Sequence, residues 1–179
     1  MVVDSRARFE ALYRAHAGAV RSYVRRRSDA QTADDVVADV FVTAWRRLSD
    51  MPDDPLPWLL GVARRTLANR RRGWARDEAL RDRMVSEQTS APSADSLTSE
   101  SDQAVLRALS ALSERDREAL LLVGWEGLEA TQAARVLGVH PNTFAARMYR
   151  ARRRFARALA ADPGPSDQAR RSVKAEVLP

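Results

Sequence analysis

A three-and-four spacing of apolar residues runs from Val36 to Leu48. This spacing matches the 3.6-residue period of an α-helix, so the apolar side chains would share one buried face. No stretch of the chain alternates apolar and polar residues with the β-branched and aromatic richness of strands. Glycine is scarce, with seven residues in 179, whereas the helix formers alanine, leucine and arginine are frequent. The sequence therefore predicts an all-α fold.

Similar spacing predicts one helix before the segment at residues 36–48 and another after it. Apolar residues at 9–24 mark an earlier helix, and those at 58–67 mark a later one that Pro57 would begin. Thr32, followed by Asp35 three residues on, resembles a capping box at the start of the middle helix. Three such helices would close one small domain.

The helical pattern fades in the middle of the chain and then resumes. Residues 77–103 are polar, acidic and rich in serine, which is typical of a flexible linker. We therefore expect two small helical domains, at residues 1–76 and 104–161, followed by a polar tail at 162–179. Within the second domain, Ser113 is the predicted N-cap of a helix.

Charge is unevenly distributed along the chain. The net charge is +6 and the isoelectric point is about 10.8, which favours a polyanionic partner. Residues 59–76 carry six arginines and no acid, and residues 140–157 carry six more and no acid. Two such blocks predict two contacts with nucleic acid, although solvated helix faces would give the same pattern.

Several classes of protein are disfavoured by what the sequence lacks. There is no cysteine, which excludes disulfides and thiolate metal sites, and there are only two histidines. Without a glycine-rich phosphate loop or metal-ligand spacing, we expect no cofactor, no metal, no small-molecule substrate and no catalysis. The N-terminus lacks the apolar core of a signal peptide, and no apolar run could cross a bilayer. These features predict a soluble, cytoplasmic protein.

The strongest motif lies between Thr131 and Met148. Ala134 supplies the small residue and Gly138 the turn of a helix-turn-helix, whose second helix Pro141 would start. The first residues of such a helix approach base edges in the major groove, and its arginines bind phosphates or bases. A plain corner of two helices with a basic face is the alternative. The predicted DNA-binding residues are Pro141, Asn142, Thr143, Arg147, Arg150, Arg153 and Arg154.

A second basic block, at residues 58–76, contains tryptophans beside its arginines. Aromatic rings stack on exposed bases while guanidinium groups hold the backbone, so this block predicts contact with unpaired DNA. Ordinary packing at the rim of a core would also account for Trp58. The residues predicted for this contact are Trp58, Arg64, Arg65, Asn69, Arg70 and Arg72.

The middle helix of the first predicted domain carries acids beside an aromatic ridge. Asp34, Asp35 and Asp39 lie near Phe41 and Trp45, which together would suit a basic, helical protein partner. The alternative is that both aromatic residues belong to the core and that the aspartates are solvated or cap the helix.

Taken together, these motifs resemble the numbered regions of the sigma-70 family of RNA polymerase sigma factors. Residues 33–47, Ala-Asp-Asp-Val-Val-Ala-Asp-Val-Phe-Val-Thr-Ala-Trp-Arg-Arg, resemble region 2.2, and residues 58–72 resemble regions 2.3 and 2.4. Residues 112–122 resemble region 4.1, and the helix-turn-helix resembles region 4.2. Neither a region 1.1 nor a region 3 is apparent, which points to the extracytoplasmic-function group.

The resemblance implies partners as well as a fold. Core RNA polymerase would bind through its β′ clamp helices and β flap, and an anti-sigma factor, often membrane-anchored, would hold the protein inactive. Promoter DNA would be read at the −35 element by the helix-turn-helix and at the −10 element by the basic block, with the Asp50–Pro57 loop forming a pocket for one flipped-out base. The implied polymerase-binding residues are Asp35, Val36, Asp39, Val42, Trp45 and Arg46.

The sequence also departs from the family pattern. Ala38 stands in place of a frequent glutamine, Arg65 in place of the usual asparagine, and Ala145 in place of a common lysine. These departures leave the promoter sequence open. A stand-alone helix-turn-helix regulator that binds operators without polymerase is the alternative function, although it leaves the basic block at 58–76 unexplained.

Overall fold

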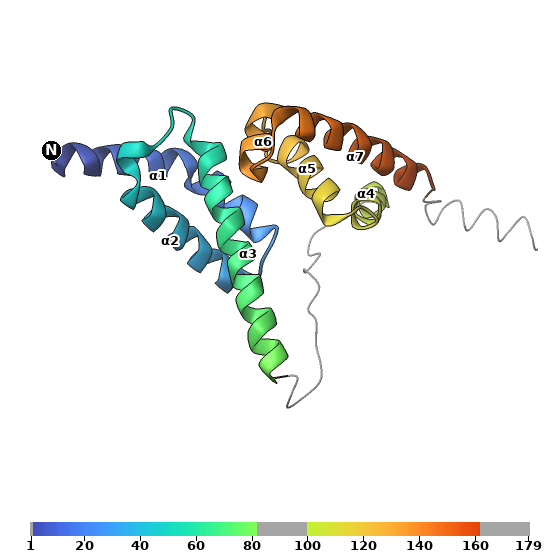
Figure 1. Ribbon diagram of the computed structural model, residues 1–179, viewed down its shortest axis with the longest axis horizontal. Coiled ribbons are helices and arrows are strands. Elements are labelled where there is room, and N and C mark those ends of the chain that lie inside the picture. The colour runs from blue at the N-terminus through green and yellow to red at the C-terminus, as the bar shows by residue number, and fades with distance from the viewer. Residues whose placement is uncertain (1, 82–99, 162–179) are drawn as a thin grey trace, which may run out of the picture. The chain divides into compact units, whose positions relative to one another are not determined.

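A computed structural model describes residues 2–81 and 100–161, and within these ranges it contains helices and no strand (Figure 1). The all-α prediction is confirmed. Both α3 and α4 extend into the residues predicted as a linker; the rest of that linker and the predicted tail lie outside the described residues. The elements are α1 (Val2–Arg25), α2 (Ala30–Arg46), the 3₁₀ turn η1 (Leu48–Asp50), α3 (Pro55–Arg81), α4 (Glu100–Ser110), α5 (Glu114–Gly124), α6 (Ala130–Leu137) and α7 (Pro141–Ala161).

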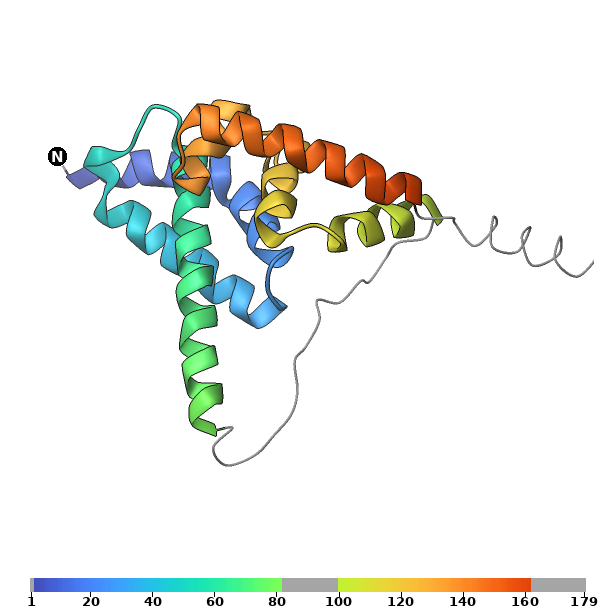
Figure 2. The same ribbon diagram turned by 45° about the vertical axis from the view of Figure 1, so that its right-hand side comes forward.

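The helices pack into two compact units. The first unit contains α1, α2 and α3, with residues 131–139 grouped with them, and the second contains α4, α5 and α7. Within the first unit each of the three long helices contacts the other two (Figures 1 and 2).

The buried face of α2 is the stripe that the apolar spacing predicts. Val36, Val40 and Ala44 have no exposed surface, and they pack in a core that includes Val20 of α1 and Leu59 of α3. Full burial of a valine or leucine side chain stabilises a fold by about 1.5–3 kcal/mol. This seam between three helices is therefore the main source of stability in the first unit.

The third helix begins earlier than predicted, at Pro55 rather than at Pro57. Proline lacks a backbone N–H, but the N–H groups of a helix's first turn have no intrahelical partner in any case. Both prolines therefore fit within the first turn of α3. Leu48–Asp50 form a short 3₁₀ turn before it, so the Asp50–Pro57 loop that the resemblance implies is shortened at both ends.

The start of α2 is capped by Asp29, so the prediction of a capping box at Thr32 and Asp35 is wrong. The Asp29 carboxylate accepts hydrogen bonds from the Thr32 backbone N–H at 2.9 Å and from the Thr32 hydroxyl at 2.7 Å. The bond from the backbone N–H, followed by the one from the hydroxyl, lowers the pKa of Asp29. The charged carboxylate is thus the form that stabilises the helix start.

In the second unit, α5 begins at the predicted N-cap. The Ser113 hydroxyl accepts a hydrogen bond from the Asp116 backbone N–H at 3.2 Å, which confirms the prediction. Apolar side chains from α4, α5 and α7, and from the segments that follow α4 and α5, form the core of this unit. Those that are buried are Ala108, Leu109, Leu112, Ala119, Leu122, Leu128, Phe144, Met148 and Ala151.

The turn between α6 and α7 has the geometry that the helix-turn-helix pattern requires. Gly138 has a φ of 65°, a left-handed conformation that glycine adopts without steric cost. The Val139 N–H donates to the Ala134 carbonyl at 3.0 Å, and the Gly138 N–H donates to the Arg135 carbonyl at 3.1 Å. These two bonds form a Schellman motif, which ends α6 sharply and lets α7 begin at Pro141.

We predict that Asp29→Ala lowers the urea midpoint of unfolding at pH 7, because two hydrogen bonds at the start of α2 are lost. Asp29→Asn retains an acceptor but no charge, and should fall between the two. Since folding lowers the pKa of Asp29, the advantage of wild type over Asp29→Asn should be present above the usual value of 3.8 and disappear as the pH falls below it. Equal midpoints for wild type and Asp29→Ala at pH 7 would contradict the assignment.

Candidate functional site

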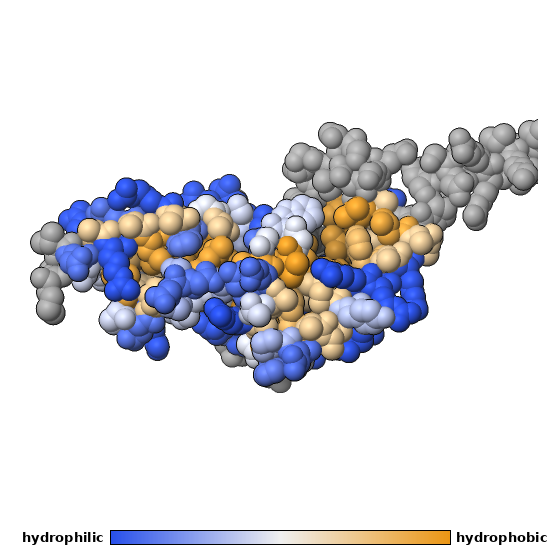
Figure 3. Space-filling model, turned by 90° about the horizontal axis from the view of Figure 1, so that it is seen from above, coloured by the Kyte–Doolittle hydropathy of each residue, from blue (hydrophilic) through white to orange (hydrophobic). Residues whose placement is uncertain are grey.

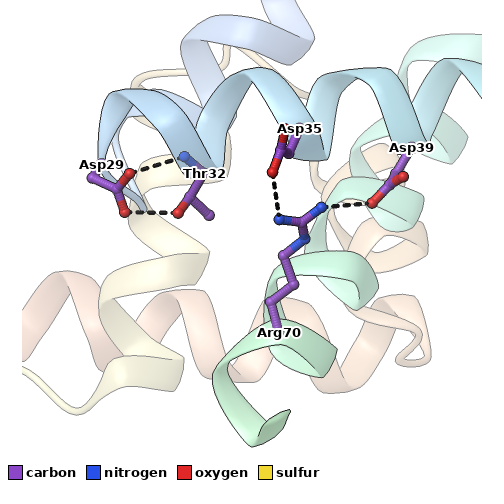
Figure 4. Close-up of polar contacts among 5 residues, drawn as sticks. All are labelled: Asp29, Thr32, Asp35, Asp39 and Arg70. Atoms are coloured by element: carbon purple, nitrogen blue, oxygen red, sulfur yellow. Dashed lines mark hydrogen bonds and ion pairs between the residues drawn. The ribbon is translucent and has the colours of Figure 1, made fainter. Parts of the chain in front are cut away.

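Two aspartates on the exposed side of α2 are bridged by one arginine of α3 (Figure 4). Arg70 Nη1 lies 3.1 Å from Asp35 Oδ2, and Arg70 Nη2 lies 3.0 Å from Asp39 Oδ2. Asp35 and Asp39 are four residues apart, so they occupy neighbouring turns on the same face of the helix. We call these two carboxylates the acidic stripe.

The ion pairs tie a residue predicted to contact DNA to two residues predicted to contact polymerase. Hydrogen bonds to Asp39 and then to Asp35 raise the pKa of Arg70, so the guanidinium stays charged. Together with the Arg70 guanidinium, the acidic stripe carries a net charge of about −1, rather than the −2 of the two carboxylates alone. Solvent reaches all three groups, so each pair is of the exposed kind that stabilises a fold by roughly 0.2–1 kcal/mol.

Beside the acidic stripe, α2 exposes apolar side chains. Val42 is 48% exposed and Trp45 is 45% exposed, whereas Phe41 is buried. The Trp45 ring packs edge-on against Phe9 of α1, with ring centroids 5.2 Å apart, and Tyr13 packs similarly against Phe41 at 4.6 Å. Apolar patches also lie among hydrophilic residues on the face of the molecule in Figure 3. Phe9 therefore packs against the Trp45 ring, and the exposed part of the ring can contact a partner.

The residues predicted for polymerase binding thus divide into two groups. Asp35, Asp39, Val42 and Arg46 recur at helical spacing and are all exposed on α2, and Trp45 lies at the edge of that face. Val36 is completely buried in the core. In the described structure its role is to hold α2 in place rather than to touch another molecule.

A cavity of about 400 Å³ lies between the C-terminal half of α2 and one face of α3. Three residues predicted to contact the −10 element, Trp58, Arg65 and Asn69, line it together. Sequence reasoning missed Thr43 of α2 and Arg47, the residue that caps the C-terminal end of α2; both line the cavity. The lining residues are Thr43, Arg47, Trp58, Val62, Arg65, Thr66 and Asn69.

The other residues predicted for the −10 element lie outside this lining. Arg70 is held by the acidic stripe, and Arg64 is partly buried elsewhere on α3. Arg72 donates a hydrogen bond from Nη2 to Asn69 Oδ1, so it supports a lining residue. Some residues of the basic block therefore line the cavity, Arg72 supports a lining residue, and Arg70 bridges α3 to α2.

The outer face of α7 presents most of the residues predicted to read a major groove. Asn142, Thr143, Arg150 and Arg153 are exposed, as is Pro141, where the helix begins; Arg147 is partly buried. Tyr149 was missed, although it lies on the same face and is 62% exposed. Its spacing of four residues from Arg153, whose guanidinium lies 5.7 Å from the ring centre, is the signal that could have identified it.

One predicted DNA-binding arginine also makes a contact within the fold. Arg154 of α7 donates from Nη1 to the carboxylate of Asp116 on α5. The Asp116 side chain is only 7% exposed, whereas that of Arg154 is more than half exposed. Because a buried carboxylate without a partner is costly, this pair joins α5 to α7.

Among residues 2–81 and 100–161, no group of three or more histidine or acidic side chains is placed to hold a metal ion. In the same ranges, no helix is both long enough and apolar enough to span a membrane.

Comparison with protein families matches both halves of the chain. Residues 12–76 match the family described as Sigma-70 region 2, and residues 102–155 match Sigma-70, region 4. A probable RNA polymerase sigma factor, RfaY of Xanthomonas campestris pv. campestris, is 31% identical over 136 residues, which cover 69% of this chain but 33% of that protein. The RNA polymerase sigma factor NccH of Alcaligenes xylosoxydans xylosoxydans is 28% identical over 149 residues, covering 78% of this chain and 77% of the relative. The chain thus spans about a third of one relative and most of the other.

Two solved structures of similar fold are complexes. The sigma factor RpoE bound to the anti-sigma factor NepR, from Bartonella quintana, matches with a TM-score of 0.65 and 25% identity over 86% of this chain and 98% of that chain. CnrH in complex with the cytosolic domain of CnrY matches with a TM-score of 0.58 and 28% identity, over 86% and 88% of the two chains.

We predict that Arg154→Ala destabilises the second unit, because it leaves the buried Asp116 carboxylate without its partner. Solvent screens the exposed guanidinium, so the expected loss in the free energy of unfolding is about 1–2 kcal/mol. Urea unfolding followed by helical circular dichroism measures it. Arg152→Ala, an exposed arginine on the same helix, is the matched control and should change the free energy by less than about 0.5 kcal/mol. Identical curves for the two variants would show that the pair contributes nothing.

Proposed function

Because this chain belongs to the sigma-70 family and is of the extracytoplasmic-function type, we propose that it binds core RNA polymerase and directs initiation at promoters with −35 and −10 elements. The observation that carries the proposal is that regions 2 and 4 occur in one chain, in order. Each region also presents a helix with exposed arginines, α3 in the first and α7 in the second. Two basic helices suit two separate contacts with DNA.

In this proposal the polymerase clamp docks on the exposed face of α2. The acidic stripe attracts basic side chains, and Val42 and Trp45 provide the apolar surface that a stable contact needs. Val36 supports this face from the core. The combination of charge and an aromatic anchor favours a helical, basic partner.

The two DNA contacts would use different chemistry. On α7, Asn142 and Thr143 at the N-terminal end would approach base edges of the −35 duplex, while Arg150 and Arg153 bind bases or phosphates. On α3, the side chains around the cavity would engage an unpaired strand of the −10 element, where stacking and backbone contacts dominate. The residue ranges 1–76 and 104–161 are our proposed limits for the two domains.

An anti-sigma factor is a further proposed partner. The sigma factor RpoE, which has a similar fold, is seen in complex with an anti-sigma factor, and CnrH is seen in complex with the cytosolic domain of CnrY. By analogy, an inhibitor would cover surfaces that this chain needs for polymerase or DNA. We also place the protein in the cytoplasm, where polymerase acts, and assign it no catalytic role of its own.

The alternative, a stand-alone helix-turn-helix regulator, is less well supported. It requires only residues 131–161, and it gives no role to region 2 or to the exposed face of α2. A pull-down with core polymerase separates the two functions, since an operator-binding regulator would not be retained.

Run-off transcription over a library of genomic fragments tests the proposal directly. Core polymerase with the purified chain should start transcription at defined sites that core polymerase alone does not use. Trp45→Ala should weaken co-purification with core polymerase by about tenfold or more, because it removes the exposed aromatic anchor.

Trp125→Ala is the matched control for the polymerase experiment. Trp125 is also an exposed tryptophan, but it follows α5 in the second unit and lies outside the proposed surface. Its substitution should leave polymerase binding at the wild-type level. Equal losses for the two variants would remove the assignment of α2, and an absence of any start site would remove the proposed function.

We further predict that Arg150→Ala weakens binding to a duplex that carries the −35 element. If Arg150 contacts a phosphate, the slope of log K against log salt concentration should fall by about one. Filter binding or fluorescence anisotropy at several salt concentrations measures both quantities. Arg115→Ala, an exposed arginine on α5, should leave the slope unchanged. An unaltered slope and affinity for Arg150→Ala would reject this contact.

A further inference from the structure

Tyr149 and Arg153 lie one helical turn apart on the outer face of α7. The Tyr149 side chain is 62% exposed and lies away from the side of the helix on which Phe144 and Met148 are buried. The Arg153 guanidinium lies 5.7 Å from the centre of the Tyr149 ring, and its Nη1 donates to the Tyr149 hydroxyl oxygen at 3.5 Å. The ring and the hydroxyl together hold this guanidinium on the outer face of α7.

A tyrosine holds an arginine without compensating its positive charge. Arg70 and Arg154, by contrast, are paired with aspartate carboxylates, which carry the opposite charge. The attraction between a guanidinium and an aromatic ring comes from the quadrupole of the ring, which has no net charge. Residues 140–157 also contain no acid. The Arg153 guanidinium is therefore held in one place and keeps its full charge for an anion.

The position of Arg153 along α7 indicates which part of a DNA duplex it would meet. Asn142 lies in the first turn of the helix and is proposed to approach base edges. Arg153 follows eleven residues later, which is about 16 Å farther along the helix axis. The major groove is about 12 Å wide, so a helix that places Asn142 over the bases carries Arg153 to a phosphate strand at the edge of the groove. Phosphate oxygens only accept hydrogen bonds, which suits a guanidinium.

We propose that Tyr149 is a positioning residue whose ring holds the Arg153 guanidinium toward a phosphate at the edge of the −35 major groove; the inference rests on the proposed function. The gain is entropic, because a long arginine side chain loses rotamer freedom when a phosphate fixes it. A guanidinium that already rests on a ring loses less of this freedom on binding. Since a phosphate carries no sequence information, Tyr149 strengthens binding to every −35 sequence by the same factor and selects no base.

The experiment measures the affinity of the complete holoenzyme for a promoter identified in the run-off assay, at several salt concentrations. An exposed pair of a guanidinium and a ring is weak, so Tyr149→Ala should lower the affinity by about two- to fivefold. Tyr149→Phe keeps the ring and should recover most of this loss. Arg153→Ala should lower the affinity at least as much as Tyr149→Ala, and it should reduce the slope of log K against log salt concentration by about one.

Combined variants separate positioning from a direct contact of Tyr149 with DNA. If Tyr149 acts through Arg153, Tyr149→Ala should cause no further loss of affinity in the Arg153→Ala background. In the matched Arg152→Ala background the loss should persist in full, because Arg152, also exposed, projects about 100° around the helix from Arg153. The loss should also be equal on promoters whose −35 bases are changed one at a time.

The possible failures are distinguishable. Wild-type affinity of Tyr149→Ala, or a loss in Tyr149→Phe as large as that in Tyr149→Ala, overturns the inference. So does a further loss in the double variant with Arg153→Ala, or a loss that depends on the −35 base, since either shows a direct contact of Tyr149 with DNA. In each of these cases the proposed function stands. If the wild-type holoenzyme binds the promoter no better than core polymerase does, the proposed function and this inference fall together.

Discussion

The packing of α3 against α2 determines every site in the first unit. Burial of Val36 and Val40 sets the rotation of α2 about its axis, and burial of Leu59 and Ala63 sets that of α3. Successive side chains of an α-helix differ by about 100° in direction, so the buried face of each helix also decides which residues are exposed. The acidic stripe, the exposed aromatic surface and the cavity all follow from this one contact. A substitution that altered the α2–α3 seam would displace them together.

The contact also couples the two binding surfaces electrostatically. Arg70 comes from the helix proposed to engage DNA, and it neutralises part of the stripe proposed to engage polymerase. A basic side chain of polymerase must therefore either displace Arg70 or join it. Exposed ion pairs are worth at most about 1 kcal/mol, so displacement is inexpensive. A guanidinium released in this way would add one positive charge to the helix that is proposed to contact DNA. Polymerase binding would therefore strengthen DNA binding.

Local features of this fold could be predicted from sequence, whereas contacts between helices could not. The turn at Gly138 and the cap at Ser113 each depend on residues within one helical turn, and both predictions are confirmed. The cap at Asp29 was missed because a second pattern nearby fitted as well. Thr43 and Arg47 carry no signal for a cavity, since the lining forms only when α3 crosses α2. Periodicity predicts which face of a helix is buried but not which neighbour covers it.

Carboxylates tie some arginines of this chain into contacts between helices, which leaves fewer arginines for the proposed contacts with DNA. Arg70 is held by two aspartates and Arg154 by a buried one, although both lie in blocks without any acid of their own. A guanidinium must give up such a bond before it can bind a phosphate, and for the buried carboxylate of Asp116 the loss is large. The number of phosphate contacts, and with it the salt dependence of DNA binding, should therefore be smaller than the number of arginines on α3 and α7 suggests.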